Sequence, residues 1–287
     1  MAPLVRIPPS TKLRVAVCHV DFALDGLGAT SESLSGKLAH VDRLVRAAKN
    51  LVPHLIVFPE GAGCELLHKQ ASAWAVDLSA TTVCGTSQMG QHVAGIIIGP
   101  DGMRETFYKK HLSPYDSPAA VGQLLQAESA GIDLAIPCTA IDGTPMTANV
   151  RVLICYDFRF YQPGDMAFNT TQMVVVPMHD PKFDEPELIA SALAQRHYLR
   201  TFLVNKAKSG STSLHSSAFG PLSDPQAKQL ATQGAAGVDA KTNRIWQTNV
   251  EGVTLGEYEV AQYVALGHDT AYGGGFLYRV EHHPLVS

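Results

Sequence analysis

Apolar and polar residues alternate along this chain in blocks that predict strands and helices in turn. Residues 13–19 and 54–58 are short apolar runs rich in β-branched side chains, which is typical of buried strands. Between them, residues 31–49 carry leucine and valine at helical spacing, and most charged side chains fall outside that face. A strand, a helix and a second strand in this order predict the opening of an α/β domain.

The alternation continues to about Trp246. A Gly-Pro-Asp-Gly turn at 99–102 predicts a hairpin. The further predicted strands are residues 82–86, 93–98, 104–108, 133–136, 141–148, 150–154, 173–177, 201–205, 215–220 and 234–239, and the further predicted helices are a short one that closes at 166–171 and a longer one at 187–200. Because no linker, repeat or low-complexity stretch interrupts this pattern, we expect a single domain at 12–250 and a C-terminal extension at 251–287 that packs on the domain or on a partner subunit.

Composition and charge narrow the class of protein. The 287 residues are 46% hydrophobic and 17% charged, which is typical of a soluble globular protein with a substantial core. A formal net charge of -4 indicates no basic surface for nucleic acid or an anionic membrane. No apolar run reaches the roughly 18 residues of a transmembrane helix, and residues 1–10 lack the apolar segment of a signal peptide. We therefore expect a cytoplasmic protein with a small-molecule partner, and neither nucleic acid nor membrane as a partner.

The cysteines and histidines do not form a recognisable metal-binding or disulfide pattern. The five cysteines are odd in number and contain no Cys-x-x-Cys pair, which argues against a disulfide scaffold and a thiolate zinc site. His179, His197 and the His282-His283 pair fit no standard ligand spacing. We therefore expect no metal and no other cofactor.

A chemically capable residue follows each of three predicted strands. Glu60 comes after 54–58, the Lys109-Lys110 pair after 104–108, and Cys155 directly after 150–154. Ligands commonly bind at the carboxyl ends of strands in an α/β sheet. Each position also has an ordinary structural interpretation, because free cysteines usually pack as small hydrophobic residues, acids often cap helices, and adjacent lysines often face solvent.

Taken in order, these segments resemble motifs of the nitrilase superfamily of carbon–nitrogen hydrolases. The matching segments are Phe-Pro-Glu at 58–60, Tyr-Lys-Lys-His-Leu at 108–112 and Cys-Tyr-Asp-Phe-Arg-Phe at 155–160. The resemblance covers roughly residues 12–250. It implies a single-domain α/β fold, the four-layer αββα sandwich of the nitrilase type, and assembly as a homodimer or a larger homo-oligomer.

The resemblance also implies a catalytic set. It makes Glu60 the general base and Cys155 the nucleophile. Lys109 matches the catalytic lysine better than Lys110 because of its spacing to His111. A thiol near pKa 8.5 is mostly protonated at pH 7, so a carboxylate that accepts its proton and a cation that holds the thiolate suit the same chemistry.

Two further roles come from the same resemblance. The family places a second glutamate between the lysine and the cysteine, and Glu128 is the acid assigned to it. The oxyanion that forms on an attacked carbonyl needs hydrogen-bond donors, and we expect Lys109 and the backbone N–H of Tyr156 to supply them.

The chain departs from the family pattern around the predicted pocket. Gln162 follows the cysteine segment where related chains commonly carry a glutamate, and His179-Asp180 follows the next strand where many carry an aromatic residue. His179, Asp180 and Arg159 are therefore the candidate residues of the substrate pocket.

The resulting prediction is a thiol-dependent hydrolase that cleaves a small carboxamide or carbamoyl compound through a cysteinyl thioester and releases ammonia. Tyr-Asp after the cysteine is more typical of amidase branches than of true nitrilases. The alternatives are a nitrilase acting on a small nitrile, an N-acyltransferase that uses the same acyl-enzyme, and a catalytically inactive binding scaffold.

Overall fold

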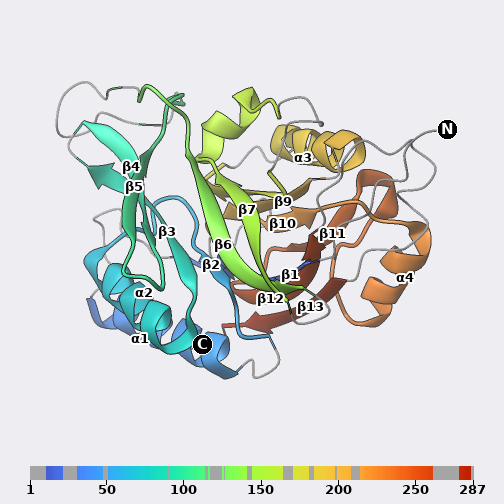
Figure 1. Ribbon diagram of the computed structural model, residues 1–287, viewed down its shortest axis with the longest axis horizontal. Helices are drawn as coiled ribbons and strands as arrows, with labels where there is room; N and C mark the ends of the chain where they lie inside the picture. Colours follow the sequence, from blue (N-terminus) through green and yellow to red (C-terminus); the bar gives the residue numbers. More distant parts are fainter. Residues whose placement is uncertain are drawn as a thin grey trace.

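The structure is a computed structural model, shown in Figure 1. It describes residues 11–21, 31–47, 51–89, 91–113, 116, 125, 127–140, 144–163, 171–180, 184–197, 199–207, 214–260 and 278–285.

Within the described residues, thirteen strands form one continuous sheet that turns back on itself. The strands are β1 (Thr11–His19), β2 (Leu55–Val57), β3 (Thr81–Met89), β4 (His92–Ile98), β5 (Arg104–Tyr108), β6 (Ile132–Ala140), β7 (Pro145–Val152), β8 (Met173–Met178), β9 (Arg200–Asn205), β10 (Ser216–Phe219), β11 (Arg244–Thr248), β12 (Gly252–Val260) and β13 (Tyr278–Pro284). Their order is β11-β10-β9-β8-β7-β6-β1-β2-β3-β4-β5, with β12 pairing with β1 and β13. β1 and β6 pair only at Thr11 and Lys12, so this contact joins two halves of the sheet: a first half of β1–β5, β12 and β13, and a second half of β6–β11.

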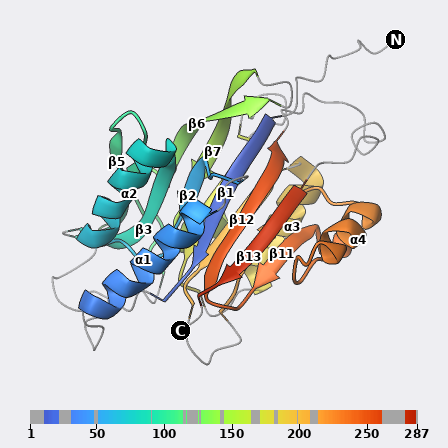
Figure 2. The same ribbon diagram turned by 90° about the horizontal axis from the view of Figure 1, so that it is seen from below.

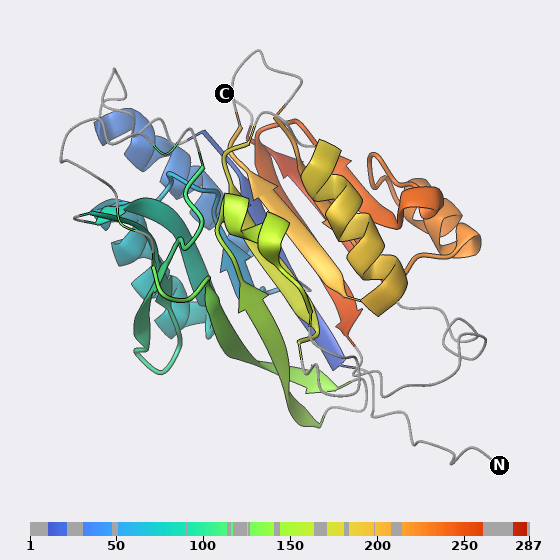
Figure 3. The ribbon, with the colours of Figure 1, turned by 90° about the horizontal axis from the view of Figure 1, so that it is seen from above.

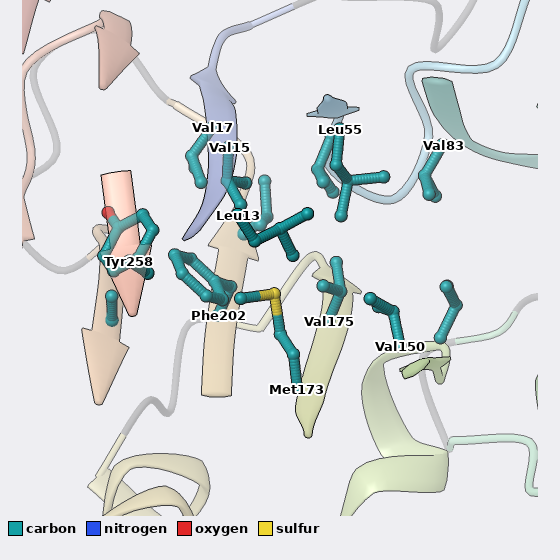
Figure 4. Close-up of a cluster of buried hydrophobic side chains, with 14 of the residues drawn as sticks. Leu13, Val15, Val17, Leu55, Val83, Val150, Met173, Val175, Phe202 and Tyr258 are labelled. Atoms are coloured by element: carbon teal, nitrogen blue, oxygen red, sulfur yellow. The ribbon is translucent and has the colours of Figure 1, made fainter. Parts of the chain in front are cut away.

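The main hydrophobic core lies between the two halves. Leu13, Val15 and Val17 of β1 face Val175 and Phe202 of the second half in one buried cluster, shown in Figure 4. Alternate residues of β1 point the other way, as the period of a strand requires. Because β1 is buried on both faces, its sequence is a nearly continuous apolar run.

Helices cover the outer face of each half. The helices are α1 (Ser31–Ala47), α2 (Glu65–Leu78), α3 (Asp184–His197) and α4 (Asp224–Thr232), with short 3-10 helices η1 (Cys155–Phe160) and η2 (Ala240–Thr242). Val41 of α1 and Trp74 of α2 pack on the first half, and the turned view in Figure 2 shows α1 along β1 and β2. Leu193 of α3 and Phe158 of η1 pack on the second half, where Figure 3 shows both elements. Two sheet halves between two helical layers confirm the expected αββα sandwich.

The structure corrects several predicted elements. α2 and α4 were not predicted, and residues 234–239, predicted as a strand, form turns that end in an isolated bridge at Asp239. Residues 141–148 and 150–154 were predicted as two strands, whereas the structure has one strand, β7. The short helix predicted to close at 166–171 falls mostly outside the described residues, which resume at Thr171.

Residues 252–260 and 278–284 belong to the sheet. β12 runs antiparallel to β1 over the whole length of both strands, and β13 pairs with β12 on its other side. Trp246 of β11 donates a 2.7 Å hydrogen bond to the hydroxyl of Tyr258 on β12, which links the two halves inside the core.

Candidate active site

The cysteine predicted as a nucleophile lies at a sharp turn. Cys155 comes shortly after β7 and begins η1, and it is buried, with 6% of the residue exposed. Its backbone has a φ of 43°, which is a left-handed conformation that costs free energy for a residue with a Cβ. The N–H of Asp157 closes the turn on the carbonyl of Ile154 at 2.9 Å. Because of this turn, the side chain of Cys155 does not continue the alternating pattern of β7.

Glu60 follows β2 and is held by the neighbouring strand β3. The N–H of Gly61 donates to Oγ1 of Thr86 at 3.1 Å. Gly85 has a φ of 73°, and a Cβ at that position would collide with the carbonyl oxygen of Pro59. Glycine is therefore required at 85 for β3 to approach the segment that carries Glu60.

Lys109 follows β5 and is almost fully buried, with its side chain 1% exposed. Its ammonium donates to Oε1 of Glu60 at 2.9 Å and lies 2.9 Å from Oδ2 of Asp116. Burial alone lowers the pKa of Lys109, but the negative charges of Glu60 and Asp116 outweigh burial and raise it. The lysine is therefore a fixed cation between two carboxylates and the sulfur.

The thiol of Cys155 lies against this ion pair. Burial first, and then the charge of Glu60, raise the pKa of Cys155 well above its usual value, while Lys109 and a hydrogen bond from the backbone N–H of His179 oppose the rise. A neutral thiol with a carboxylate already in place to accept its proton is the arrangement that general-base activation of a nucleophile requires.

Asp157 connects the cysteine turn with the lysine segment. Its carboxylate is fully buried and accepts hydrogen bonds from the N–H groups of Lys110 at 3.1 Å and His111 at 2.7 Å. Lys110 borders a cavity of about 420 Å³ that is also lined by His111 and Asp157. The structure therefore brings Lys109, and not Lys110, to Glu60.

Asp116 takes the place that the sequence assigned to Glu128. Glu128 is exposed, and the structure does not bring it to Lys109. The carboxylate of Asp116 is only 11% exposed and also accepts a hydrogen bond from the N–H of Ser113. The sequence carries one signal for this residue, since Asp116 is the only acid between positions 113 and 126. Glu128 looked suitable because it is glutamate, but the carboxylate that contacts the ammonium of Lys109 is that of Asp116, seven positions further along the chain.

The three candidate pocket residues lie beside the cysteine turn. Arg159 of η1 donates to Oδ2 of Asp180 at 3.2 Å, so two of them form an ion pair with each other. His179 is exposed, whereas its backbone N–H binds the sulfur. Asp180 is in turn held by Asn205, a residue that the sequence did not single out.

Tyr156 carries the backbone N–H that the sequence predicts as the other oxyanion donor. It is the second residue of η1, and backbone N–H groups in the first turn of a helix have no partner within that helix. Its ring lies under the guanidinium of Arg159 at 5.2 Å from the ring centre. The N–H is therefore next to the nucleophile in sequence and lies at a helix start that favours negative charge.

The described residues form neither a metal cluster nor a membrane-spanning helix. No three His, Cys, Asp or Glu side chains in the part of the chain that the structure describes gather as a metal site. In the same part of the chain, none of the helices combines the length and the apolar character needed to cross a membrane.

Comparison with solved structures shows which fold this is. No protein-family model matches the chain, and no curated protein matches it in sequence. Nit3 of Saccharomyces cerevisiae, a member of branch 10 of the nitrilase superfamily, is similar with a TM-score of 0.56 at 16% identity, over 87% of this chain and 90% of that one. XC1258 from Xanthomonas campestris, a CN-hydrolase superfamily protein with an arsenic adduct in the active site, is similar with a TM-score of 0.53 at 14% identity, over 86% and 90%.

A mutant of the amidase from Nesterenkonia sp. AN1 is similar with a TM-score of 0.55 at 15% identity, over 93% of this chain and 97% of that one. In that structure the acetamide moiety of fluoroacetamide is covalently added at the active-site cysteine. The three likenesses confirm that this chain has the nitrilase-type fold expected from its sequence motifs.

Proposed function

We propose that this protein is a carbon–nitrogen hydrolase of the nitrilase superfamily that cleaves a small carboxamide or carbamoyl compound through a cysteinyl thioester. One observation carries the proposal: Glu60, whose charge raises the pKa of the Cys155 thiol, is ion-paired at 2.9 Å with the buried Lys109. These residues come from the ends of three different strands. A nucleophile, a base and a cation are the groups that acyl transfer from an amide needs.

In the acylation step, the sulfur of Cys155 attacks the carbonyl carbon of the amide while its proton passes to Glu60. The oxyanion is held by the ammonium of Lys109 and the N–H of Tyr156. The C–N bond then breaks as Glu60 returns the proton to the leaving nitrogen. Ammonia departs and the acyl group stays on the sulfur as a thioester.

In the deacylation step, Glu60 takes a proton from water, and the hydroxide attacks the thioester carbonyl. Collapse of the second oxyanion breaks the C–S bond, and the thiolate regains the proton from Glu60. The carboxylic acid is released. The balance is one amide and one water consumed, and one acid and one ammonia produced.

Asp116 supports both steps through Lys109. With carboxylates at 2.9 Å on two sides, the ammonium keeps its charge and its position although it is buried. A buried cation with a single partner would be free to rotate away from the oxyanion. Asp116 is therefore a positioning residue for Lys109 in this mechanism.

The alternatives differ in the chemistry that comes after the attack of the sulfur. A nitrile would first give a thioimidate, and an N-acyltransferase would admit an amine in place of water. A binding scaffold would form no covalent adduct. The buried thiol with a carboxylate near it favours an enzyme over a catalytically inactive binding scaffold. We further propose that the enzyme acts in the cytoplasm as a homo-oligomer.

Mass spectrometry with a panel of small carboxamides, carbamoyl compounds and nitriles tests the proposal. We expect acid-quenched protein to carry an acyl group on Cys155 and the solution to contain ammonia in the same amount as the acid. Fluoroacetamide is a second probe, since its acetamide moiety is expected to add to Cys155 as the C–F bond breaks and fluoride leaves.

Cys155→Ala should abolish the adduct and the ammonia. Cys138→Ala is the matched control, because Cys138 is a buried cysteine of β6 away from the three strand ends. An acyl group that leaves only on addition of an amine would indicate the transferase. Folded protein that forms no adduct and releases no ammonia with any compound would contradict the proposal.

A further inference from the structure

The turn that presents Cys155 is strained and therefore depends on the contacts around it. Cys155 has a φ of 43°, and a residue with a Cβ keeps such a conformation only where its surroundings hold it. On one side, the carboxylate of Asp157 accepts the N–H groups of Lys110 and His111. These bonds hold the first residues of η1 against the lysine segment.

Arg159 ties the second half of η1 to the residues that follow β8. Its Nη2 donates to Oδ2 of Asp180 at 3.2 Å, and its Nη1 is ion-paired with Glu185 at the start of α3. The guanidinium carbon also lies 5.2 Å from the ring centre of Tyr156. The side chains of Arg159 and Asp180 are 20% and 13% exposed, whereas that of Glu185 is 57% exposed. Because solvent screens the exposed pair more strongly, Asp180 is the principal partner of Arg159.

Asp180 is itself held by a buried carboxamide. Oδ1 of Asn205 accepts the N–H of Asp180 at 3.2 Å, and Nδ2 of Asn205 donates to the carbonyl of Asp180 at 2.9 Å. Asn205 is fully buried, and its own N–H donates to the hydroxyl of Ser216 on the neighbouring strand β10 at 2.9 Å. Asp180 lies beyond the last residue of β8, so Asn205 binds the backbone groups that the strand no longer pairs. Asp180 is therefore a fixed point to which a guanidinium can be anchored.

This pairing changes the role that the sequence assigned to Arg159 and Asp180. The sequence predicts both as substrate contacts, but a substrate that bound either charge would first have to separate a partly buried ion pair, which is costly. We propose that Arg159 is instead a positioning residue: with Asp180 as its counter-charge, it anchors η1 and so fixes the sulfur of Cys155 and the N–H of Tyr156. The effect on turnover rests on the proposed function, whereas the effect on the turn does not.

Steady-state kinetics of Arg159→Ala separate positioning from substrate binding. A lost anchor misplaces the nucleophile and the oxyanion donor, so we expect kcat to fall about 10- to 100-fold while KM stays within about twofold of the wild-type value. A substrate contact would instead raise KM. Asp180→Asn should act in the same direction. The double variant should be no more than about twofold worse than Arg159→Ala, because the effects of two groups that work as a pair are not additive.

Alkylation of Cys155 by iodoacetamide needs no turnover and reports on the turn itself. The pH profile of this alkylation is measured for each variant, and peptide mass spectrometry confirms that the label is on Cys155. Only 6% of Cys155 is exposed, so a turn that opens more often makes the sulfur more accessible. We expect alkylation of Arg159→Ala to be at least about fivefold faster than that of the wild type. Glu185→Gln should have a smaller effect than Asp180→Asn, since its carboxylate is the more exposed of the two.

Arg46→Ala is the matched control. Arg46 is also ion-paired with two carboxylates, those of Asp42 and Asp77, but it lies on α1. Its variant should stay within about twofold of the wild type in kcat and in alkylation. Circular dichroism and thermal melting identify which variants are folded.

A folded Arg159→Ala variant with the wild-type kcat and the wild-type alkylation rate would overturn the proposal. So would a rise in KM with an unchanged kcat, because Arg159 would then be a substrate contact. Equal changes in Arg46→Ala would also overturn it, because a general loss of stability would then explain the effect. A wild-type protein that hydrolyses no amide would overturn the proposed function alone, since faster alkylation of Arg159→Ala would still support the anchor.

Discussion

Asp157 and His111 are joined by two hydrogen bonds to a single carboxylate oxygen. Oδ1 of Asp157 accepts the backbone N–H of His111 at 2.7 Å and its ring Nδ1 at 2.9 Å. Asp157 lies in the turn that presents Cys155, and His111 follows Lys109 by two residues. The pair therefore sets the distance between the segment that carries the nucleophile and the segment that carries the cation.

Asp157→Asn is expected to lower kcat about 10- to 100-fold and to destabilise the protein by about 1–3 kcal/mol, since the amide group cannot accept all of these hydrogen bonds and leaves a buried donor unsatisfied. Urea denaturation and steady-state kinetics measure the two effects. Asp133→Asn is the control, because that carboxylate is 72% exposed and binds Arg151 at the surface. A change of less than about 1 kcal/mol is expected there.

Glu60→Gln should change the thiol and the turnover in opposite directions. The charge of Glu60 raises the pKa of Cys155, so its removal lowers that pKa and moves the alkylation profile to lower pH. Amide hydrolysis should fall by about 10²- to 10⁴-fold, because the general base is lost. The same substitution at the exposed Glu65 should change neither quantity. A profile of Glu60→Gln that moves to higher pH would show that the carboxylate does not face the thiol.

Asp116→Asn should reduce kcat by at least about tenfold, because Lys109 loses one of its two carboxylate partners and with it part of the rise in its pKa. Glu128→Gln should stay within about twofold of the wild type, since Glu128 is exposed. Steady-state kinetics of the two variants, measured under the same conditions, decide which of the two acids supports Lys109. A loss that is larger for Glu128→Gln would restore the assignment made from the sequence.

Gly85→Ala is expected to destabilise the protein by at least about 3 kcal/mol and to reduce kcat, because the new Cβ meets the carbonyl oxygen of Pro59 and displaces Glu60. Gly102→Ala is the control that measures the cost of a left-handed backbone conformation without a steric clash at the new Cβ. Gly102 has a similar φ of 77°, but no atom lies within 4 Å of a Cβ placed there. A cost of about 1–2 kcal/mol with unchanged kcat is expected for it. Equal effects of both variants would mean that the contact with Pro59 has no part in placing Glu60.

His19 should make the fold sensitive to acid. Burial lowers the pKa of His19 from 6.5 to about 4. The unfolded chain therefore binds more protons than the folded protein between these values, and stability is complete above about pH 6.5 and falls as the pH is lowered towards 4. The loss amounts to about 3 kcal/mol at most. His19→Asn should lose this part of the pH dependence in urea denaturation measured from pH 7 to 4. An unchanged dependence would contradict the assignment.

Local patterns predicted the parts of the site that lie directly after strands. Glu60, Lys109 and Cys155 each lie just beyond a predicted strand, and the resemblance of their motifs to those of the nitrilase superfamily predicted the sandwich that brings them together. The same reasoning divided β7 in two and missed α2, although Leu67, Ala71, Trp74 and Ala75 of that helix are buried at helical spacing. Its alanines gave a weaker amphipathic pattern than the leucines and valines of α1.

By itself, the amino-acid sequence determined which residue types stand at the strand ends, because strand periodicity is a property of neighbouring residues, and the resemblance of its motifs to the nitrilase superfamily predicted the fold that brings those ends together. Only the tertiary structure decided that Asp116 and not Glu128 contacts Lys109, and that Asn205 holds the peptide of Asp180. These contacts depend on which side chains the tertiary fold brings to Lys109 and on the register of β8 with β9. Residues 25 positions apart meet there because two parallel strands end side by side, and no local pattern records that register.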